Sequence, residues 1–461
     1  MEARSLKFAA EAAHAELKNG AAETLFGNVC TDSRAAQAGD LFFAIAGEKF
    51  DGHDFINEVA GKKVAAVVVA RKKVPVPLPP CAVLIVEDVR LALGQLAAAY
   101  RQAFDLPVIA VGGSNGKTTT KELVASVLRR KFSTLWSEAS FNNDIGVPAT
   151  LFRLQPGHQA AVLEVGTNHP GELAPLVKLI QPKFGVITSI GREHLEFFGD
   201  LAGVAQEEGA LAEALPAAGK LFLNGDSEWT DAIAARSPAE VIRIGCGEKN
   251  QWRAGKIRLD KSGATFQVVA PTAAFSGEYR VNLLGRHQAV NALFAIAIGA
   301  EFGLERADIQ AGLAECPPAK MRMQFWEANG IRVLDDAYNA NADSMRAALE
   351  TLCALPLQGR RVAVLGDMAE LGVHTAAAHA EIGQFAAELK IGQLFTVGKM
   401  GAVTAQAARA AGLARVMEFA DVEGAMIAVH KILKPGDVVL LKASRSSRLE
   451  RIAETLKAEK N

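Results

Sequence analysis

The chain is organised around the stretch Val108-Ile-Ala-Val-Gly-Gly-Ser-Asn-Gly-Lys-Thr-Thr-Thr-Lys-Glu122. Its first four residues form an apolar run that predicts a buried parallel strand, and three glycines follow where the backbone must turn. Leu123, Val124, Val127 and Leu128 then recur with the spacing of one helix face. A strand, a glycine turn, Lys-Thr and a helix predict a phosphate-binding loop, because backbone N–H groups and a helix N-terminus attract an anion.

The loop is shorter than a Walker loop. It reads G-x-x-G-K-T from Gly113 to Thr118, and Val111 stands where a Walker loop has its first glycine. A chance glycine turn is the alternative, but the flanking strand and helix favour phosphate binding. Lys117 is expected to neutralise the terminal phosphates, and the Thr118 hydroxyl to ligate magnesium. The expected nucleotide contacts in the loop are Gly113, Ser114, Asn115, Gly116, Lys117, Thr118 and Thr119.

The composition is that of a soluble globular protein. The chain has 461 residues, which predicts about three domains, and its formal net charge is −1. A balanced charge gives no general attraction to nucleic acid or to an anionic membrane. The strongest apolar run, Val64–Ala70, is too short to span a bilayer and is expected to be a buried strand. The five cysteines form no C-x-x-C pair, which indicates free thiols and a cytoplasmic protein.

Three segments are expected to form separate domains of an α/β fold. Residues 1–82 predict a small α/β unit that the proline-rich run Val74–Pro80 ends as a stiff connection. Residues 83–316 alternate strands and helices around the loop, which favours a central, mostly parallel sheet. Residues 317–461 predict a Rossmann-like domain without the G-x-G-x-x-G of NAD binding. The expected strands are 108–111, 160–165, 184–190, 220–224, 361–366, 393–398 and 437–442.

Polar residues at the ends of predicted strands are candidate site residues, because ligands gather at the carboxyl ends of parallel strands. Glu164 ends one strand and His194 follows another. Taken alone, Glu164 could be a helix cap or an ion-pair partner, and His194 a packed or surface histidine. Magnesium prefers oxygen ligands, so Thr118 and Glu164 suit it better than His194. Asn291, on a predicted apolar helix, is expected to face a nucleotide base or to bond within its helix.

The combination of motifs resembles the Mur ligases, ATP-dependent amide-forming enzymes of peptidoglycan precursor synthesis. The loop Gly113–Thr118 is similar to their shortened phosphate loop, and two more segments to their central motifs: Asn142-Asn-Asp-Ile-Gly-Val-Pro148 and Glu164-Val-Gly-Thr-Asn168. Gly285-Arg-His-Gln-Ala-Val-Asn291 resembles the family's adenine-side helix, and Lys320-Met-Arg322 supplies an arginine where the family contacts the nucleotide phosphates. The resemblance covers essentially the whole chain and implies the three-domain Mur ligase architecture.

Three late motifs resemble the family member that joins D-alanyl-D-alanine to a UDP-N-acetylmuramoyl-tripeptide. The resemblance therefore implies these two substrates, with ATP and magnesium as cofactors. The motifs are Asp335-Asp-Ala-Tyr-Asn-Ala-Asn-Ala-Asp-Ser-Met345, Leu365-Gly-Asp-Met-Ala-Glu-Leu-Gly372 and Lys442-Ala-Ser-Arg445. Ala342 replaces a proline of the family pattern, and Ala443 a glycine.

The resemblance also implies roles for individual residues. The implied catalytic residues are Lys117, Glu164, His194, Glu208 and Arg322. Nucleotide contacts outside the loop are Asn291, Arg322 and Asp336. Substrate contacts are Ser33, Arg34, Asn142, Asn143, Tyr338, Asn339, Asn341, Lys442, Ser444 and Arg445. A monomer without a nucleic-acid partner and without membrane insertion is expected.

Glu208 stands where most family members carry a lysine that is carbamylated and helps to hold a second magnesium. A carbamate is a carboxylate on a long stem, so the hypothesis is that Glu208 replaces it and reaches the metal through water. The implied metal ligands are then Thr118, Glu164, His194 and Glu208. The alternative is that Glu208 is a carboxylate on a helix surface. The hypothesis predicts that bicarbonate does not stimulate the enzyme.

The expected reaction is phosphoryl transfer from ATP to a peptide carboxylate, followed by capture of the acyl phosphate by an amine. Two other functions stay open at this point. One is a different amide ligase of the same build, such as folylpolyglutamate synthase or another Mur step. The other is a nucleotide-gated binding module, which would hydrolyse ATP without forming an amide.

Overall fold

The computed structural model describes residues 1–458. By its internal contacts the chain divides into two compact units. The first unit holds residues 1–110, 132–167 and 174–183, and the second holds 111–131, 168–173 and the chain from 184 onward. The chain passes from one unit into the other within β8 (Val108–Gly112), the strand that precedes the phosphate loop.

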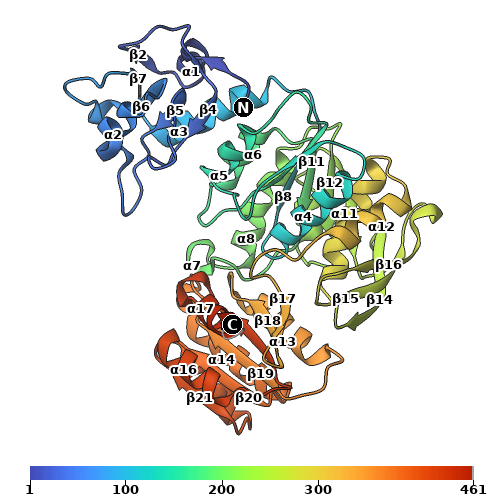
Figure 1. Cartoon of the computed structure of the whole chain (residues 1–461). Coiled ribbons are helices and arrows are strands. Elements are labelled where there is room, and N and C mark those ends of the chain that lie inside the picture. Colours follow the sequence, from blue (N-terminus) through green and yellow to red (C-terminus); the bar gives the residue numbers. More distant parts are fainter. Residues whose placement is uncertain (459–461) are drawn as a thin grey trace. The chain divides into compact units, whose positions relative to one another are not determined.

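The first unit contains a five-stranded sheet in the order β2-β7-β6-β5-β4 (Figure 1). Strands β4 to β7 run parallel, and β2 lies antiparallel to β7. The central strands are buried on both faces, as their continuous Val, Ile, Leu and Phe runs require. The strand bounds are Glu16–Lys18 (β2), Asn28–Cys30 (β4), Asp40–Phe43 (β5), Ala66–Ala70 (β6) and Ala82–Val86 (β7). Strands β1 (Arg4–Ser5) and β3 (Leu25–Phe26) pair separately, and the helices are α1 (Leu6–Ala12) and α2 (Ile56–Gly61).

This sheet corrects the expected end of the first domain. β7 pairs with β6 from Ala66–Ala82 to Ala70–Val86, beyond the proline-rich run. Val74–Pro80 therefore lies in the loop between two neighbouring strands, and the prediction that it connects two domains is wrong. Proline stiffens a loop and a linker alike, so composition alone did not distinguish them.

The rest of the first unit carries the segments around β8. Strands β9 (Thr134–Trp136) and β10 (Ala160–Glu164) pair in parallel, and Glu164 is the last residue of β10. The helices are α3 (Val89–Arg101), α5 (Gly146–Leu151) and α6 (Leu173–Ile180). The fully buried Tyr100 of α3 donates its hydroxyl to the carbonyl oxygen of Leu154 at 2.8 Å, which ties α3 to the end of the α5 segment.

The second unit begins with the loop and helix α4 (Lys117–Leu128) and continues with strands β11 to β16. Strands β11 to β14 pair in parallel, and β14, β15 and β16 pair antiparallel. The bounds are Phe184–Ile187 (β11), Lys220–Asn224 (β12), Glu240–Gly245 (β13), Trp252–Asp260 (β14), Gly263–Val269 (β15) and Gly277–Val281 (β16). The helices are α7 (Leu195–Phe198), α8 (Leu201–Glu208), α9 (Ala210–Glu213), α10 (Thr230–Ala234), α11 (Gln288–Glu301) and α12 (Arg306–Glu315).

Residues 321–458, here the C-terminal region, form a six-stranded sheet within the second unit. Its order is β17-β18-β22-β19-β20-β21, and all neighbours except β17 and β18 run parallel. The strands are Gln324–Ala328 (β17), Ile331–Asp336 (β18), Arg361–Gly366 (β19), Gln393–Val397 (β20), Val416–Phe419 (β21) and Val438–Lys442 (β22). The helices are Ala342–Ala354 (α13), Thr375–Glu388 (α14), Gly401–Ala410 (α15), Val422–Ile432 (α16) and Glu450–Ala458 (α17). The expectation of a parallel α/β layer here is confirmed.

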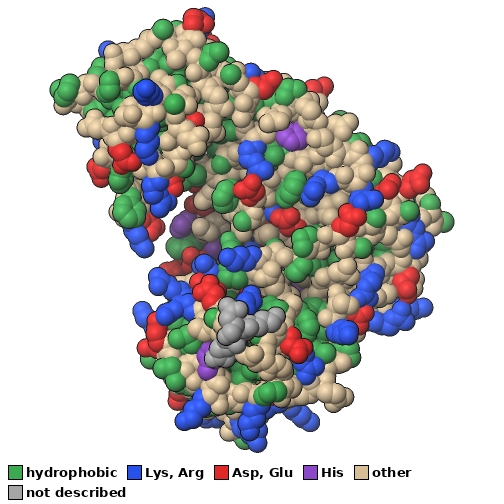
Figure 2. All heavy atoms as spheres, in the orientation of Figure 1, with side chains coloured by type: hydrophobic (Ala, Val, Ile, Leu, Met, Phe, Trp, Pro, Cys, Tyr) green, Lys and Arg blue, Asp and Glu red, His purple; other side chains and the backbone are tan. Residues whose placement is uncertain are grey.

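The surface agrees with the balanced charge of the sequence. On the face shown in Figure 2, basic and acidic side chains are interspersed over the elements. Among residues 1–458, no helix is both long enough and apolar enough to cross a membrane.

Candidate active site

The two loop glycines hold backbone that other residues rarely adopt. Gly113 has φ +106° and Gly116 has φ +87°. A Cβ atom on Gly113 would lie 2.5 Å from Thr188 Oγ1 and 2.7 Å from Thr188 N, and one on Gly116 would lie 2.6 Å from Asn291 Oδ1. The positive φ and the close neighbours both require glycine, so the chain can turn sharply into α4.

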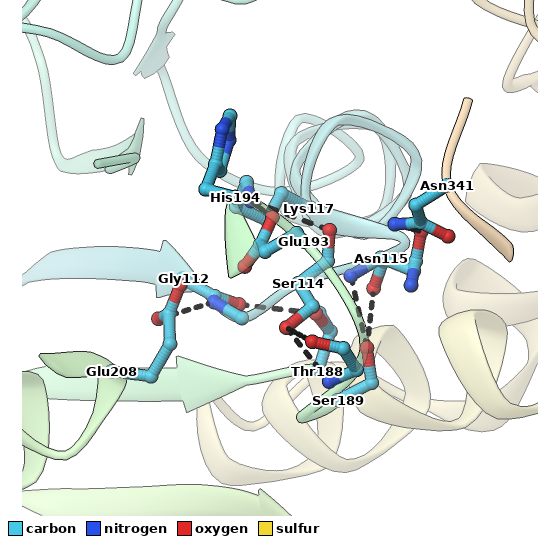
Figure 3. A network of polar contacts seen from close by, with 12 residues as sticks. Gly112, Ser114, Asn115, Lys117, Thr188, Ser189, Glu193, His194, Glu208 and Asn341 are labelled. Atoms are coloured by element: carbon cyan, nitrogen blue, oxygen red, sulfur yellow. Dashed lines mark hydrogen bonds and ion pairs between the residues drawn. The ribbon is translucent and has the colours of Figure 1, made fainter. Parts of the chain in front are cut away.

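The tip of the loop is fastened to the segment that follows β11 (Figure 3). Ser114 N–H donates to the Ser189 carbonyl at 2.8 Å, and Asn115 N–H donates to Ser189 Oγ at 2.9 Å. Gly191 N–H donates to Ser114 Oγ at 2.8 Å. These bonds preorganise the loop, and the first-turn N–H groups of α4, which have no acceptor inside their own helix, supply its anion-binding capacity.

Lys117, the first residue of α4, forms an ion pair with Glu193. Its Nζ lies 3.2 Å from Glu193 Oε2, and the Glu193 side chain is 8% exposed. Lys117 Nζ also donates to the Ser114 carbonyl at 3.4 Å. The lysine is therefore folded over the loop and paired with a carboxylate.

Glu208 is buried beneath the loop, at the end of α8. Its Oε2 accepts the Gly113 N–H at 2.6 Å, and its buried Oε1 has no hydrogen-bond partner among residues 1–458. Burial raises the pKa of Glu208 to about 8, and the positive charge of Lys117 opposes that rise. The alternative of a surface carboxylate is excluded, because the residue is 1% exposed.

Thr118 and Arg322 contact each other although they lie far apart in the sequence. Arg322 Nη2 donates to Thr118 Oγ1 at 3.2 Å, and Thr118 is 3% exposed. The Arg322 guanidinium also lies 4.2 Å from the centroid of the Tyr338 ring, a cation–π contact that fixes its direction. A planar cation thus lies beside the helix start where phosphate is expected.

The ends of β18 and β22 carry a second polar cluster. Lys442 Nζ lies 2.6 Å from Asp336 Oδ2 and donates to the Asn339 carbonyl at 3.1 Å, and both side chains of the pair are largely buried. Asp336 Oδ1 accepts the Met323 N–H at 3.0 Å. Asn341 caps α13 and also donates from Nδ2 to Asn115 Oδ1 at 3.0 Å. Asn341 therefore joins the late motif to the phosphate loop.

Two further residues of the late motifs are placed as supports. Ser444 Oγ accepts the Ala369 N–H at 2.9 Å, and Arg445 pairs with Glu450 at 3.2 Å.

Asn291 makes the bond within its own helix, because its Nδ2 donates to Gln288 Oε1 at 2.9 Å. It also contacts Thr120 of α4 at 3.4 Å.

Two of the predicted metal ligands, His194 and Glu208, lie in the second unit and have separate partners. The His194 ring turns to Glu370, with Nδ1 2.5 Å from Glu370 Oε2, and Figure 3 shows it pointing away from the Glu208 carboxylate. Among residues 1–458 there is no group of three or more His, Cys, Asp and Glu side chains placed to hold a metal ion. In this structure His194 is hydrogen-bonded to Glu370, and Glu208 is hydrogen-bonded to the backbone of Gly113.

The first unit holds the remaining predicted residues. Glu164 is 1% exposed, and its Oε1 accepts from Asn142 Nδ2 at 2.9 Å while its buried Oε2 has no partner among the described residues. Asn143 Oδ1 accepts the Gly146 N–H at 2.9 Å and so fixes the start of α5. Arg34 is exposed and paired with Asp32 at 2.7 Å, and the Ser33 carbonyl accepts from Lys62 Nζ at 2.7 Å.

Three residues of the site were not predicted from the sequence. They are Arg192, Glu193 and Glu370, the last of which lies within the motif Leu365–Gly372. Arg192 contacts Asp343 at 2.7 Å and Glu381 at 2.6 Å, more than 150 positions along the chain. Three consecutive ionisable residues, Arg-Glu-His, after a predicted strand were a signal that a site lies here. The sequence carried no signal for their partners, because those residues belong to distant elements.

Three family profiles match successive segments of the chain. They are "Mur ligase family, catalytic domain" over residues 26–101, "Mur ligase middle domain" over 111–299, and "Mur ligase, glutamate ligase domain" over 321–445. Among curated proteins, the UDP-N-acetylmuramoyl-tripeptide–D-alanyl-D-alanine ligase of Escherichia coli (strain K12) is 37% identical, over 93% of each chain. The ligase of the same name from Bacillus subtilis (strain 168) is 34% identical, over 98% of each chain.

Solved structures give the same likeness. A crystal structure of MurF from Acinetobacter baumannii superimposes with a TM-score of 0.91 at 32% identity, and the match covers 99% of each chain. The MurF ligase of Thermotoga maritima, solved in complex with ADP, gives a TM-score of 0.81 at 25% identity, over 94% of this chain and 97% of that one.

Proposed function

This chain belongs to the Mur ligase family, and on that premise we propose that it joins D-alanyl-D-alanine to a UDP-N-acetylmuramoyl-tripeptide, forming ADP and phosphate from ATP. The product is the UDP-muramoyl-pentapeptide of peptidoglycan synthesis. The observation that carries the proposal is whole-chain similarity to ligases of this specificity, with no segment of substantial length left unmatched.

The geometry around the loop supports phosphoryl transfer. The peptide carboxylate oxygen attacks the γ-phosphorus of ATP, and the bond to the β–γ bridging oxygen breaks, so that ADP leaves. Negative charge spreads over the transferred group, and Lys117, Arg322 and the first turn of α4 are the positive groups that converge there. Lys117 must exchange Glu193 for phosphate oxygens at this stage.

Magnesium fits the chemistry of two predicted acidic ligands, one in each unit. Glu208 and Glu164 each have one buried carboxylate oxygen without a hydrogen-bond partner among residues 1–458, and a cation would satisfy such an oxygen. We propose Thr118, Glu164 and Glu208 as residues that hold the ion, directly or through water. When bound, magnesium would neutralise charge on the transferring phosphate.

The second step is acyl transfer. The amine of D-alanyl-D-alanine attacks the carbonyl carbon of the acyl phosphate, phosphate leaves with the bonding electron pair, and the amine gives up a proton. The cluster of Asp336, Asn341 and Lys442 is joined to the phosphate loop by the Asn341–Asn115 hydrogen bond, and we propose that it lies beside the reacting acyl phosphate. His194 is the side chain in this region suited to accept a proton.

We infer three functional domains, with the first boundary moved from residue 82 to after Val86 and the second kept near residue 316. Ser33 and Arg34 are proposed contacts of the uridine nucleotide, and the exposed Arg34 must then exchange Asp32 for phosphate. Asn142, Asn143, Tyr338, Asn339, Ser444 and Arg445 are the further proposed substrate contacts. A cytoplasmic monomer is proposed, in keeping with five free cysteines.

One experiment tests the function directly. The protein is mixed with ATP, a magnesium salt, UDP-N-acetylmuramoyl-tripeptide and D-alanyl-D-alanine, and the pentapeptide product is sought by mass spectrometry. Amide formation with glutamate on a folate, or with a single amino acid, would point to another ligase of this build. ATP hydrolysis without any amide product would contradict the proposal.

Lys117→Ala should lower turnover by at least ~10²–10³-fold, the usual cost of one charge-stabilising donor. Arg258→Ala is the matched control, because it also removes a cation, but one whose side chain is 72% exposed and pairs with Glu278. Turnover that survives Lys117→Ala would overturn the role of the loop.

A further inference from the structure

The motif Leu365–Gly372 lies against helix α7, which follows His194. The Glu370 carbonyl accepts the Glu196 N–H at 3.0 Å, and His374 Nε2 lies 3.1 Å from the Gly199 carbonyl oxygen. Leu195 and Phe198 of α7 are buried in one apolar cluster with Leu371. The C-terminal region therefore grips the segment that carries His194.

His194 and Glu370 are both held in strained backbone. His194 has φ +47° and Glu370 has φ +61°, in the left-handed region that non-glycine residues seldom occupy. Backbone strain of this kind gathers at functional sites. The two side chains meet with Nδ1 2.5 Å from Oε2, and the imidazole is 14% exposed.

Glu370 stands on a rigid support. The next residues back along the loop are fixed, because Met368 N–H donates to His379 Nε2 at 3.0 Å and Ala369 N–H donates to Ser444 Oγ at 2.9 Å. Asp367 accepts the N–H groups of Lys399 and Met400 at 2.9 and 3.0 Å. The motif thus fixes where the Glu370 carboxylate points.

This contact decides which nitrogen of His194 carries the proton. A hydrogen bond to the carboxylate needs the proton on Nδ1, and Nε2 then carries the lone pair. Whether His194 accepts the amine proton or ligates a metal, it needs that lone pair on Nε2.

We propose that Glu370 is a positioning residue for the ligase reaction: from the C-terminal region it fixes the ring direction and the Nδ1–H tautomer of His194, and so presents the Nε2 lone pair to the reacting groups. The proposal rests on the proposed function for its catalytic meaning. Docking of the Leu365–Gly372 loop then completes the site, since the loop supplies the partner that His194 needs.

The variants separate positioning from simple docking. Glu370→Ala removes the acceptor, whereas Glu370→Gln keeps an amide oxygen that can still accept from Nδ1–H. His374→Ala is the matched control, because it removes a contact between His374, which follows the motif, and Gly199, which follows α7, without touching His194.

The first measurement needs neither nucleotide nor substrate. Nitrogen-15 NMR of histidine-labelled protein, with the His194 signal assigned by His194→Ala, should show the Nδ1–H tautomer in the wild type, in Glu370→Gln and in His374→Ala. Glu370→Ala should lose that signature. A wild-type ring protonated on Nε2 would overturn the proposal, even if the protein makes the expected pentapeptide.

The second measurement is kinetic. Glu370→Ala should lower kcat about 10–100-fold, the usual effect of removing a carboxylate that orients a functional histidine, and Glu370→Gln should restore part of the loss. In a His194→Ala background, Glu370→Ala should have no further effect. If Glu370→Ala lowered kcat equally in the His194→Ala background, or if His374→Ala lowered kcat as much as Glu370→Ala does, Glu370 would only hold the loop against α7. Either result would overturn the proposal. If the wild type forms no pentapeptide, the function itself is wrong, and the tautomer measurement still stands.

Discussion

At the residue scale, Glu208 combines features that are costly unless a cation is bound. One carboxylate oxygen accepts the Gly113 N–H, and the other is buried with no hydrogen-bond partner among the described residues. Burial raises the pKa of Glu208 to about 8 and so favours the neutral carboxyl near pH 7. A cation that bound here would stabilise the ionised form instead.

Glu208→Gln should therefore leave the stability of the fold nearly unchanged while weakening the binding of magnesium. Gln imitates the neutral carboxyl and can still accept the Gly113 N–H, so the free energy of unfolding should stay within about 1 kcal/mol of wild type. The magnesium concentration for half-maximal activity should rise at least ~10-fold. Urea unfolding and a magnesium titration measure the two effects, with the exposed Glu228→Gln as control. An unchanged titration would refute the metal role, and so would stimulation of the wild type by bicarbonate.

The residues of the loop could be predicted from the sequence, because a phosphate loop is local. Lys117 and Thr118 follow Gly116 directly, and the helix start fixes where they lie. Their partners could not be predicted in the same way. Glu193 and Arg322 reach the loop from other elements, and no periodicity in the sequence encodes a contact across 76 or 204 positions. The contact of His194 with Glu370 also joins residues that lie 176 positions apart in the sequence, and it could not be predicted from sequence patterns.

At the element scale, the link from β8 to α4 depends on Gly113. Its positive φ and the nearby Thr188 backbone leave no room for a side chain. Gly113→Ala should destabilise the fold by about 1–3 kcal/mol and should weaken ATP binding more than ten-fold, because the loop must shift away from Thr188. Urea unfolding and nucleotide titration would measure this. Gly157→Ala is the control, since a Cβ there meets no atom within 4 Å; equal effects of the two variants would contradict the argument.

Strands in the parallel layers were the most predictable elements. Their apolar runs are continuous because both faces are buried, so β8, β12 and β19 were placed to within a residue. Boundaries that depend on tertiary contacts were less predictable. α11 begins at Gln288, after Gly285 with φ +118°, although the apolar pattern starts at Leu284. The domain boundary predicted at the prolines before β7 depended on a tertiary contact too, the pairing of β7 with β6.

Arg192 joins the strand-end segment to two helices of the C-terminal region. Its guanidinium contacts Asp343 at 2.7 Å and Glu381 at 2.6 Å, from α13 and α14. Arg192→Ala should lower kcat/KM about ten-fold with a small loss of stability, because these partly exposed ion pairs position more than they stabilise. Steady-state kinetics of Arg192→Ala and the surface control Arg409→Ala would check this. Equal kinetics in the two variants would remove Arg192 from the site.

The stability that the Arg192–Glu381 contact contributes should decrease at acidic pH. Ion pairing with Arg192 lowers the pKa of Glu381 below its ordinary 4.5. A carboxyl with a lowered pKa adds stability above its unfolded pKa, and that stability is lost as pH falls through the folded value. Wild type should therefore lose more stability than Arg192→Ala as pH falls below about 4.5. Thermal unfolding at pH 7 and at acidic pH would show the difference shrinking, whereas a constant difference would contradict the linkage.

At the scale of the whole molecule, the reaction needs water to be kept from the acyl phosphate. Within the second unit, the C-terminal region closes on α7, where Leu195 and Phe198 are 6% and 9% exposed in a shared apolar cluster with Met345 and Leu371. The family's three-part order could be predicted from motifs along the chain, but the insertion of α7 into the C-terminal core could not. A four-residue helix has too few turns to show an apolar stripe in the sequence.

Phe198→Ala should uncouple the two half-reactions. Removing a buried ring costs about 3–5 kcal/mol of packing, so the contact between α7 and the C-terminal region should open more often and water should reach the acyl phosphate. The ratio of phosphate released to pentapeptide formed should then rise from about one in the wild type, because each hydrolysed intermediate consumes ATP without product. Phe197→Ala is the control on the same helix, since that ring is 38% exposed and lies against His169. A ratio that stays at one in Phe198→Ala, while total turnover falls, would mean that the acyl phosphate is protected by contacts other than this apolar cluster.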